Sequence, residues 1–445
     1  MTGESRTATS HNVGAGQDSG RVSDPKTRPM SAAQRQIWFV DQLAPGLTAY
    51  NTARAFRLVG ALDTKSLEAA VADVVERHEI LRTVFREVGG EPVPLVLPPG
   101  GQRLTTCEVD TPSVVDREQH ALNIVTDHVR QPFDLAAGPL IRFVLIRLDA
   151  ETHILAFVVH HICTDGWSMR FIVKDLADRY NAHLNGHKSQ IEPPEVQFAD
   201  FADWQREKRG DNERDLEFWR DYLADLQTLE LTTDRRRPSA PTYRSSLISG
   251  SLSPELTAAL HLLAERSGAS MLMILTTAFA AVLARHTRQS EIVLGTAAAG
   301  RPGPEFMDVI GPFINMLVLR NDVSGDPTFT ELLDRTKALL LQVWRRRHVP
   351  FEMVVAATRT ERDASRNPLF QVGIQLLERT PEPQFHGVET TWLGIDAGSH
   401  PLDLSISAYE TADGLQFRVE FATDLFDRSR VHRLMSHLEL VLRAA

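Results

Sequence analysis

The stretch ETHILAFVVHH, residues 151–161, is almost entirely apolar and ends in two valines followed by two histidines. A continuous apolar run with a β-branched end is typical of a β-strand that is covered on both faces. Such a strand needs other elements packed on each side of it. The run therefore predicts a layered fold in which this strand is interior.

Helical patterns flank that strand in the first half of the chain. In DTKSLEAAVADVVERH (63–78), residues Leu67, Val71, Val74, Val75 and His78 recur at helical spacing, and Asp63 is placed to cap the helix. The segment SMRFIVKDLADRYNAHL (168–184) returns to the same spacing. The first half thus mixes helices and strands.

The second half has the same mixed character. Four elements are expected there: a helix in SPELTAALHLLAERSG (253–268), a helix over 268–284, a short strand EIVLG (291–295), and a hairpin over 405–421 that turns at Asp413 and Gly414. We expect Asp427 to cap a last helix whose core side carries Val431, Leu434, Leu438 and Val441. The fold class predicted is α/β (α+β), with two lobes and a cleft between them.

Length and local composition indicate how these elements divide. A chain of 445 residues exceeds one ordinary domain. Residues 185–215 are charged and contain Pro193 and Pro194, which favours a boundary there. We expect a disordered tail at 1–29, an N-terminal lobe at 30–190 and a C-terminal lobe at 191–445.

Composition excludes several classes of function. The 48 basic and 58 acidic residues give a net charge of −10, which argues against binding to nucleic acid. The two cysteines, Cys107 and Cys163, offer neither a disulfide framework nor a thiolate metal site, and a reduced, cytoplasmic setting fits best. The weakly polar run 268–284 is interrupted by Ser270, Thr276 and Thr277, so a buried helix is expected rather than a membrane span.

The two histidines at the strand end indicate proton-transfer chemistry. Side chains alternate along a strand, so His161 and His160 point to opposite faces and only one lines a given cavity. A neutral imidazole in a cavity is a candidate general base. Asp165 and Gly166 follow in the turn, where a glycine permits backbone angles or close approaches that a larger residue obstructs.

A purely structural interpretation of the same residues is also open. Both histidines could be hydrogen-bonded groups at a strand end, and Asp165 could cap the next helix. The chain also contains no GxSxG nucleophile elbow and no HExxH metal motif. A covalent serine mechanism and a zinc site of that type are therefore not indicated.

The string HHxxxDG at residues 160–166 resembles the signature of the condensation domains of nonribosomal peptide synthetases, members of the chloramphenicol-acetyltransferase-like superfamily. Further segments are similar to other motifs of that family in the same order. They are MSAAQRQIWFVDQL (30–43), RHEILRTVF (77–85), FADFADWQRE (198–207), IGPFINMLVLR (310–320), VPFEMVV (349–355) and RDASRNPLFQV (362–372).

This resemblance implies two acetyltransferase-like lobes that form a V with a central tunnel. It implies that an acyl group arrives as a thioester on the phosphopantetheine of a separate carrier protein and passes to an acceptor, with no other cofactor and no metal. His161 would deprotonate or orient the acceptor. His160, Asp165, Gly166 and Arg301 would support the motif, with Asp165 paired to Arg301 from the other lobe.

Other segments keep more than one interpretation. Asn367 is a candidate for substrate contact or a turn residue before Pro368. The family often has a histidine where this chain has Arg346, inside WRRRH (344–348), and this run is either a docking patch for an acidic carrier protein or a solvated helix end. IDAGSHPL (395–402) faintly resembles a carrier-protein serine motif, but we expect a lobe-crossing segment there.

Within the family, DGWSM with RHEILRTVF resembles bond-forming members. We expect an acyltransferase that forms an amide or an ester. We expect it to be free-standing, like enzymes of antibiotic and enediyne pathways. Its acceptor would be a small molecule or a carrier-bound group, and no membrane would be involved. Two alternatives stay open: a non-catalytic module that docks carrier proteins, and an epimerase of carrier-bound aminoacyl groups.

Overall fold

The computed structural model describes residues 28–445 except 101, 110–112, 187–193, 359–362 and 364. Of the expected tail at 1–29, residues 1–27 lie outside the described residues. The expected lobe boundary between 190 and 191 lies outside them as well. Arg28 is described, and its guanidinium lies 2.6 Å from the carboxylate of Asp200. Arg28 is therefore held against the body of the protein.

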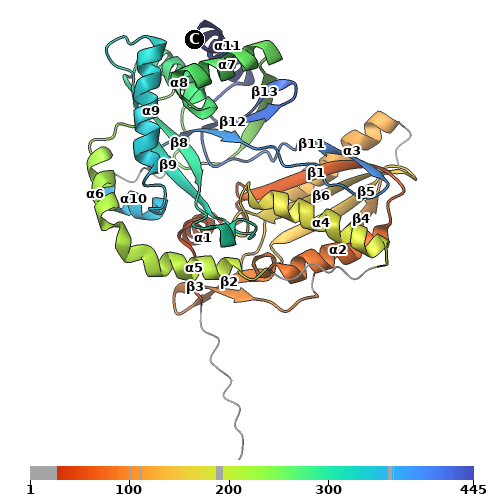
Figure 1. Cartoon of the computed structure of the whole chain (residues 1–445). Helices are drawn as coiled ribbons and strands as arrows, with labels where there is room; N and C mark the ends of the chain where they lie inside the picture. Colours follow the sequence, from red (N-terminus) through yellow and green to blue (C-terminus); the bar gives the residue numbers. More distant parts are fainter. Residues whose placement is uncertain (1–27, 101, 110–112, 187–193, 359–362, 364) are drawn as a thin grey trace, which may run out of the picture.

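The first sheet has five strands in the order β11-β1-β6-β5-β4 (Figure 1). The strands are β1 (Asn51–Gly60), β4 (Leu104–Glu108), β5 (Ile141–Arg147), β6 (Thr152–His160) and β11 (Val388–Leu393). β6 lies in the middle and pairs antiparallel with both β1 and β5. Residues 153–160 are all buried, which confirms the interior strand that the apolar run predicts.

The second sheet has six strands in the order β7-β13-β12-β10-β8-β9. They are β7 (Ser245–Ser251), β8 (Glu291–Ala299), β9 (Ile314–Asp322), β10 (Val372–Leu377), β12 (Leu404–Thr411) and β13 (Gly414–Ala422). A separate hairpin joins β2 (Thr83–Val88) to β3 (Glu91–Val96). β12 and β13 form the predicted hairpin, with Asp413 in its turn.

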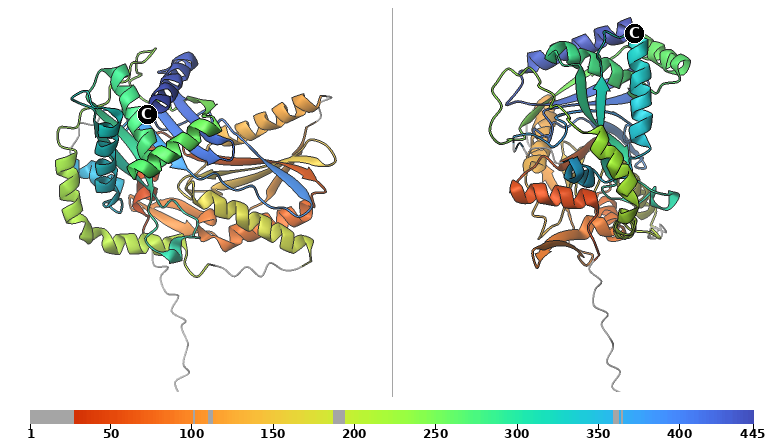
Figure 2. Two further views of the ribbon diagram at one scale, coloured as in Figure 1. Left: turned by 45° about the horizontal axis from the view of Figure 1, so that its top comes forward. Right: turned by 90° about the vertical axis from the view of Figure 1, so that its left-hand side faces the viewer.

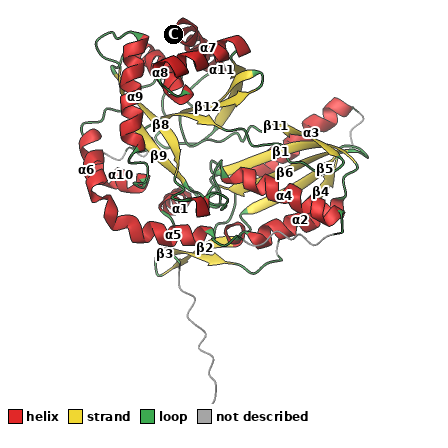
Figure 3. Ribbon diagram, viewed as in Figure 1, coloured by secondary structure: helices red, strands yellow, loops and turns green. Residues whose placement is uncertain are grey.

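Helices cover both sheets (Figure 3). In the first lobe, α2 and α4 pack side by side while α3 contacts β1 and β6. The helices are α1 (Ala32–Leu43), α2 (Thr64–Arg77), α3 (Val114–Arg130), α4 (Ser168–Leu184), α5 (Phe198–Glu207), α6 (Glu213–Tyr222), α7 (Pro254–Ser267), α8 (Met271–Thr287), α9 (Phe329–Trp344), α10 (Phe351–Thr358) and α11 (Arg428–Ala444), with short 3-10 helices at Glu79–Arg82, Lys208–Asn212 and Pro304–Phe306.

Each sheet has its own hydrophobic core, and the first core draws on distant parts of the chain. The buried residues of the first core include Phe198 and Phe201 of α5 and side chains from two later segments: Phe306, Val309, Ile310, Phe313, Phe385, Val388 and Ile395. β11 also completes the first sheet by pairing antiparallel with β1. The mixed α/β fold with two lobes is thus confirmed, and segments from the second half of the chain cross into the first lobe (Figure 2).

Local signals in the sequence account for most helix ends. The side chain of Asp63 accepts the Ser66 N–H at the start of α2, and Ser253 with Pro254 begins α7. Gly268 ends α7 with a left-handed φ of 58°, a conformation that glycine adopts readily. The strand expected at 291–295 is longer than predicted, because β8 runs on to Ala299 beside β9.

Two details of the last helix are wrong in the sequence-based prediction. Asp427 stands at the start of α11 but makes no side-chain cap, because its carboxylate pairs with Arg235 instead. The core side of α11 carries Val431, Leu434, Leu438 and Leu442, and Val441 is only partly buried. A helix of 3.6 residues per turn places either residue 441 or residue 442 inward, so spacing alone does not decide between them.

No single helix in the described part of the chain is both long and apolar enough to cross a membrane. α7 and α8 pass that test only together, and they meet at an angle of 104°. α8, which contains most of the weakly polar run, is largely buried in the second core.

Candidate active site at the end of strand β6

His160 is the last residue of β6 and is a buried structural group. Its N–H donates to the Leu140 carbonyl at 3.0 Å, and its ring lies near those of Tyr50 and Phe133, with centroids 6.3 and 6.0 Å apart. Its Nδ1 accepts the Ile162 N–H at 3.3 Å. Burial lowers the pKa of His160 to about 3, with smaller effects of His161 and Arg142, so the ring is neutral at physiological pH.

His161 lies just beyond the strand, in the turn that leads to α4. Its N–H donates to the Tyr50 carbonyl at 2.8 Å, and its own carbonyl accepts the Thr164 N–H at 3.3 Å. The residue is partly accessible, whereas His160 and Ile162 on either side of it are buried. His161 is therefore the accessible member of the pair, and it lies in the turn rather than on the strand where alternation would apply.

The environment of the His161 imidazole favours a neutral ring. Burial lowers its pKa, opposed by its own backbone carbonyl and by the negative charge of Asp165. Nδ1 is buried and has no hydrogen-bond partner in the described part of the protein. Nε2 is then the nitrogen through which a ligand would exchange a proton with this ring.

Asp165 is fixed by hydrogen bonds from both halves of the chain. One carboxylate oxygen accepts the Ser168 N–H at 2.7 Å, which also satisfies a free donor at the start of α4. The other oxygen accepts the Phe313 N–H at 3.1 Å and lies 3.2 Å from the Arg301 guanidinium. The side chains of Asp165 and Arg301 are 5% and 2% exposed, so the ion pair is almost completely removed from water.

Arg301 makes three further side-chain hydrogen bonds. Nη2 donates to Ser168 Oγ and to the Val309 carbonyl, both at 2.9 Å, and Nε donates to the Phe306 carbonyl at 3.1 Å. The guanidinium lies 4.1 Å from the centroid of the Phe313 ring. A buried charge needs such hydrogen-bond partners, and these contacts hold the turn after His161 against the second half of the chain.

Ser168 and Gly311 complete this network, and the sequence patterns predict no role for either. Ser168 Oγ donates to the Gly311 carbonyl at 2.8 Å and accepts the Gly311 N–H at 3.1 Å. A Cβ at position 311 would lie 1.9 Å from the Phe198 ring, so only glycine fits there. Ser168 is the first residue of α4 but its hydroxyl does not cap the helix, and Gly311 lies 143 positions further along the chain, so no local signal joins the two.

The backbone angles and the packing around Gly166 do not account for a glycine there. Its φ is not in the left-handed region, and a Cβ at this position would meet nothing within 4 Å. The residue is exposed, so neither backbone strain nor close packing within the protein requires glycine. The open space lies in the turn between His161 and α4.

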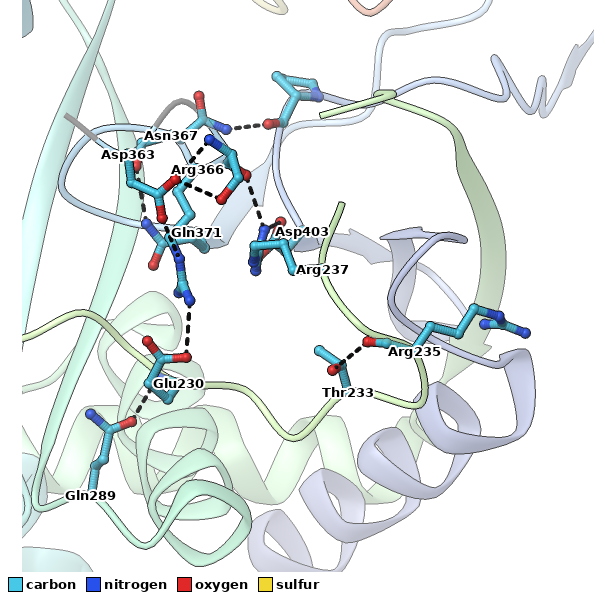
Figure 4. A network of polar contacts seen from close by, with 12 residues as sticks. Glu230, Thr233, Arg235, Arg237, Gln289, Asp363, Arg366, Asn367, Gln371 and Asp403 are labelled. Atoms are coloured by element: carbon cyan, nitrogen blue, oxygen red, sulfur yellow. Dashed lines mark hydrogen bonds and ion pairs between the residues drawn. The ribbon is translucent and has the colours of Figure 1, made fainter. Parts of the chain in front are cut away.

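Asn367 lies in a loop network of the second lobe, shown in Figure 4. Its side-chain amide donates to the Pro401 carbonyl, and its own carbonyl accepts the side-chain N–H of Gln371 at 3.0 Å. The neighbouring Asp403 pairs with Arg237. These contacts join the loop before β10 to the segment that leads into β12, as a structural role for Asn367 requires.

Part of the WRRRH run is engaged within the protein. Arg346 and His348 each lie 3.1 Å from the Asp215 carboxylate of α6, and Arg346 lies 3.8 Å above the Phe218 ring. Arg345 and Arg347 are exposed.

The described residues contain no cluster of three or more His, Cys, Asp and Glu side chains placed to hold a metal ion.

The model of the family described as "Condensation domain" matches residues 25–445. A linear gramicidin synthase polypeptide of Brevibacillus parabrevis is 36% identical over 433 residues, which are 95% of this chain and 6% of that protein. The chain thus spans only a small part of the curated relatives it matches.

Solved structures give the same result. The X-domain from teicoplanin biosynthesis superposes with a TM-score of 0.84 at 29% identity, covering 95% of this chain and 96% of that one. The SgcC5 protein from Streptomyces globisporus gives 0.80 at 25% identity, covering 94% and 98%. The chain belongs to the condensation-domain family, whose members form amide bonds by acyl transfer in nonribosomal peptide synthesis.

Proposed function

We propose that the protein transfers an acyl or aminoacyl group from the phosphopantetheine thioester of a carrier protein to an amine or alcohol acceptor. The observation that carries this proposal is the residue His161, which stays partly accessible, whose imidazole burial keeps neutral, and whose turn is fixed by Asp165 and Arg301. The carrier protein and the acceptor are the partners. The phosphopantetheine arrives with the substrate, and we propose no resident cofactor and a cytoplasmic setting.

Acyl transfer from a thioester requires one proton acceptor and correct positioning of the donor and the acceptor. The acceptor nitrogen or oxygen attacks the thioester carbonyl while its proton moves to Nε2 of His161. The C–S bond then breaks, and the proton passes to the departing pantetheine sulfur, which leaves as a thiol. Because a thioester is already activated, positioning and this single proton transfer supply the rate, and His161 acts as base or as the group that orients the acceptor.

A docking module is the second candidate. It is favoured by the likeness to the teicoplanin X-domain, a domain that also has a solved complex with OxyB. His160 and His161 are both present in this chain, which supports catalysis instead. An epimerase would exchange the α-hydrogen of a carrier-bound aminoacyl group with deuterated solvent in the absence of any acceptor.

Intact mass spectrometry of a loaded carrier protein separates these functions. An aminoacyl carrier is incubated with the protein and a panel of amine and alcohol acceptors, with His161→Ala as the comparison. We expect acyl loss from the carrier together with a matching amide or ester, reduced about 100-fold or more in the variant. A carrier that binds the protein but stays loaded across the whole panel would favour the docking module.

A further inference from the structure

A cavity of about 670 Å³ lies between segments of both lobes. Its walls come from residues 44–48 between α1 and β1, Arg130 at the end of α3, residues 241–245 leading into β7, residues 397–399 between β11 and β12, and Thr423. This volume is within the range of small-molecule sites in proteins. Tyr50, whose carbonyl accepts the His161 N–H, lies two residues beyond Thr48 of this lining.

The charge of the cavity lining is positive although the protein carries a net charge of −10. Two arginines, Arg130 and Arg244, line it, and none of the described lining residues is acidic. Arg244 is neutralised by Asp424, whose carboxylate lies 2.7 Å from its guanidinium. The guanidinium of Arg130, an exposed residue, has no ion pair or hydrogen bond with any residue that the structure describes.

The position of the Arg130 guanidinium depends on a glycine. A Cβ at position 398 would lie 2.6 Å from its Nη2, so the side chain passes directly over the backbone of Gly398. Gly398 has a φ of 69°, which favours glycine, and its N–H donates to the Asp396 carboxylate at 2.9 Å. This contact places the guanidinium at the cavity wall.

Another lining residue, Tyr243, also has an unusual backbone conformation. Tyr243 has a φ of 58°, a conformation that is uncommon for a residue other than glycine, and its carbonyl accepts the His400 N–H at 2.9 Å. Strained positions of this kind are concentrated at binding sites. Hydroxyl groups of Thr48, Ser245 and Ser399 add hydrogen-bonding capacity to the lining.

We propose that Arg130 binds an oxyanion of a substrate that occupies this cavity. The planar guanidinium fork matches a carboxylate or a phosphate and forms charge-assisted hydrogen bonds with either. The inference rests on the proposed function, because two participants in acyl transfer carry such a group: the phosphodiester of a pantetheine arm and the carboxylate of a soluble acceptor. Arg130 is then a specificity-determining residue rather than a catalytic one.

Pairs of substrates that differ only in one anionic group test this inference. They also identify which substrate carries the group that Arg130 binds. The donor pair is an acyl-pantetheine and the corresponding acyl-4′-phosphopantetheine, and the acceptor pair is an amino acid and its amide. We expect the wild-type protein to prefer the anionic member of one pair by about tenfold in kcat/KM. The pair that shows the preference identifies the group that Arg130 binds.

Arg130→Gln should abolish that preference by raising KM for the anionic member, and Arg130→Lys should keep part of the preference. Arg285→Gln is the control for net charge, because Arg285 is 86% exposed on α8 and lies outside the cavity lining. A wild-type protein that discriminates neither pair, or an Arg130→Gln variant that keeps the preference, overturns the inference.

Failure of acyl transfer itself is measured separately. Titration calorimetry with 4′-phosphopantetheine, pantetheine, the amino acid and its amide needs no turnover. Arg130-dependent binding of one anionic member without any transfer would uphold the inference while contradicting the proposed function. Equal binding within both pairs would overturn the inference even if transfer occurs.

Discussion

The two adjacent histidines have different environments, and these environments give them different roles. His160 is enclosed by Tyr50, Phe133 and the strand, and its pKa falls to about 3. His161 is held by its backbone and is only partly buried. Replacing His160 should therefore change stability, and replacing His161 should change turnover.

The low pKa of His160 has a direct consequence for stability. In the unfolded chain the imidazole titrates near 6.5, so between about pH 6.5 and pH 3 the unfolded state binds a proton that the folded state does not. The stability that neutral His160 contributes is complete above this window and is lost as pH falls through it. The slope from this group is about 1.4 kcal/mol per pH unit.

We predict that His160→Asn flattens the dependence of the free energy of unfolding on pH between about pH 4 and pH 6. Urea unfolding at several pH values measures this slope for the wild-type protein and the variant. His120→Asn, on the exposed side of α3, is the matched control and should leave the slope unchanged. Parallel curves for the wild-type protein and His160→Asn would contradict the assignment of a buried, neutral His160.

At the scale of elements, the start of α4 is where the two lobes are connected beside the site. Asp165 and Ser168 receive hydrogen bonds from the backbone N–H groups of Phe313 and Gly311, and both contact Arg301. Trp167 Nε1 donates to the Met307 carbonyl at 3.1 Å. The turn that carries His161 is thus positioned by residues 301–313.

We predict that Asp165→Ala and Arg301→Ala each lower the free energy of unfolding by about 3–5 kcal/mol, because each leaves the other charge buried without its partner. The double variant should lose less than the sum of the two single variants. Urea unfolding of the four proteins gives the coupling. Lys174→Ala, which breaks the exposed pair with Asp178 on the same helix, should cost less than about 1 kcal/mol. Additive losses would show that the buried pair is not coupled.

At the scale of the whole molecule, sequence patterns predict local elements better than they predict their partners. α2 and β6 follow from apolar periodicity and from a continuous apolar run, since both signals are local. The pairing of β11 with β1 joins residues more than 300 positions apart, and nothing in either segment specifies it. Arg130 and Gly398 are likewise brought together only by the fold.

The shared core predicts that the first lobe is not stable alone. A fragment of residues 28–186 lacks β11 and the buried side chains of Phe306, Phe313 and Phe385. We expect this fragment to lose cooperative urea unfolding and most amide protection, whereas the full chain keeps both. A fragment that unfolds cooperatively at the same urea midpoint as the full chain would show that the crossing segments are dispensable for folding.

The most direct test of the central claim is the single-turnover rate of acyl transfer from a loaded carrier, measured over a range of pH for the wild-type protein and His161→Ala. The ratio of the two rates cancels the ionisation of the acceptor itself. Because burial lowers the pKa of His161, we predict a ratio of about 100 or more at neutral pH that falls only at a pH below the ordinary histidine value of about 6.5. A ratio near one at every pH would contradict a role for His161 in the transfer.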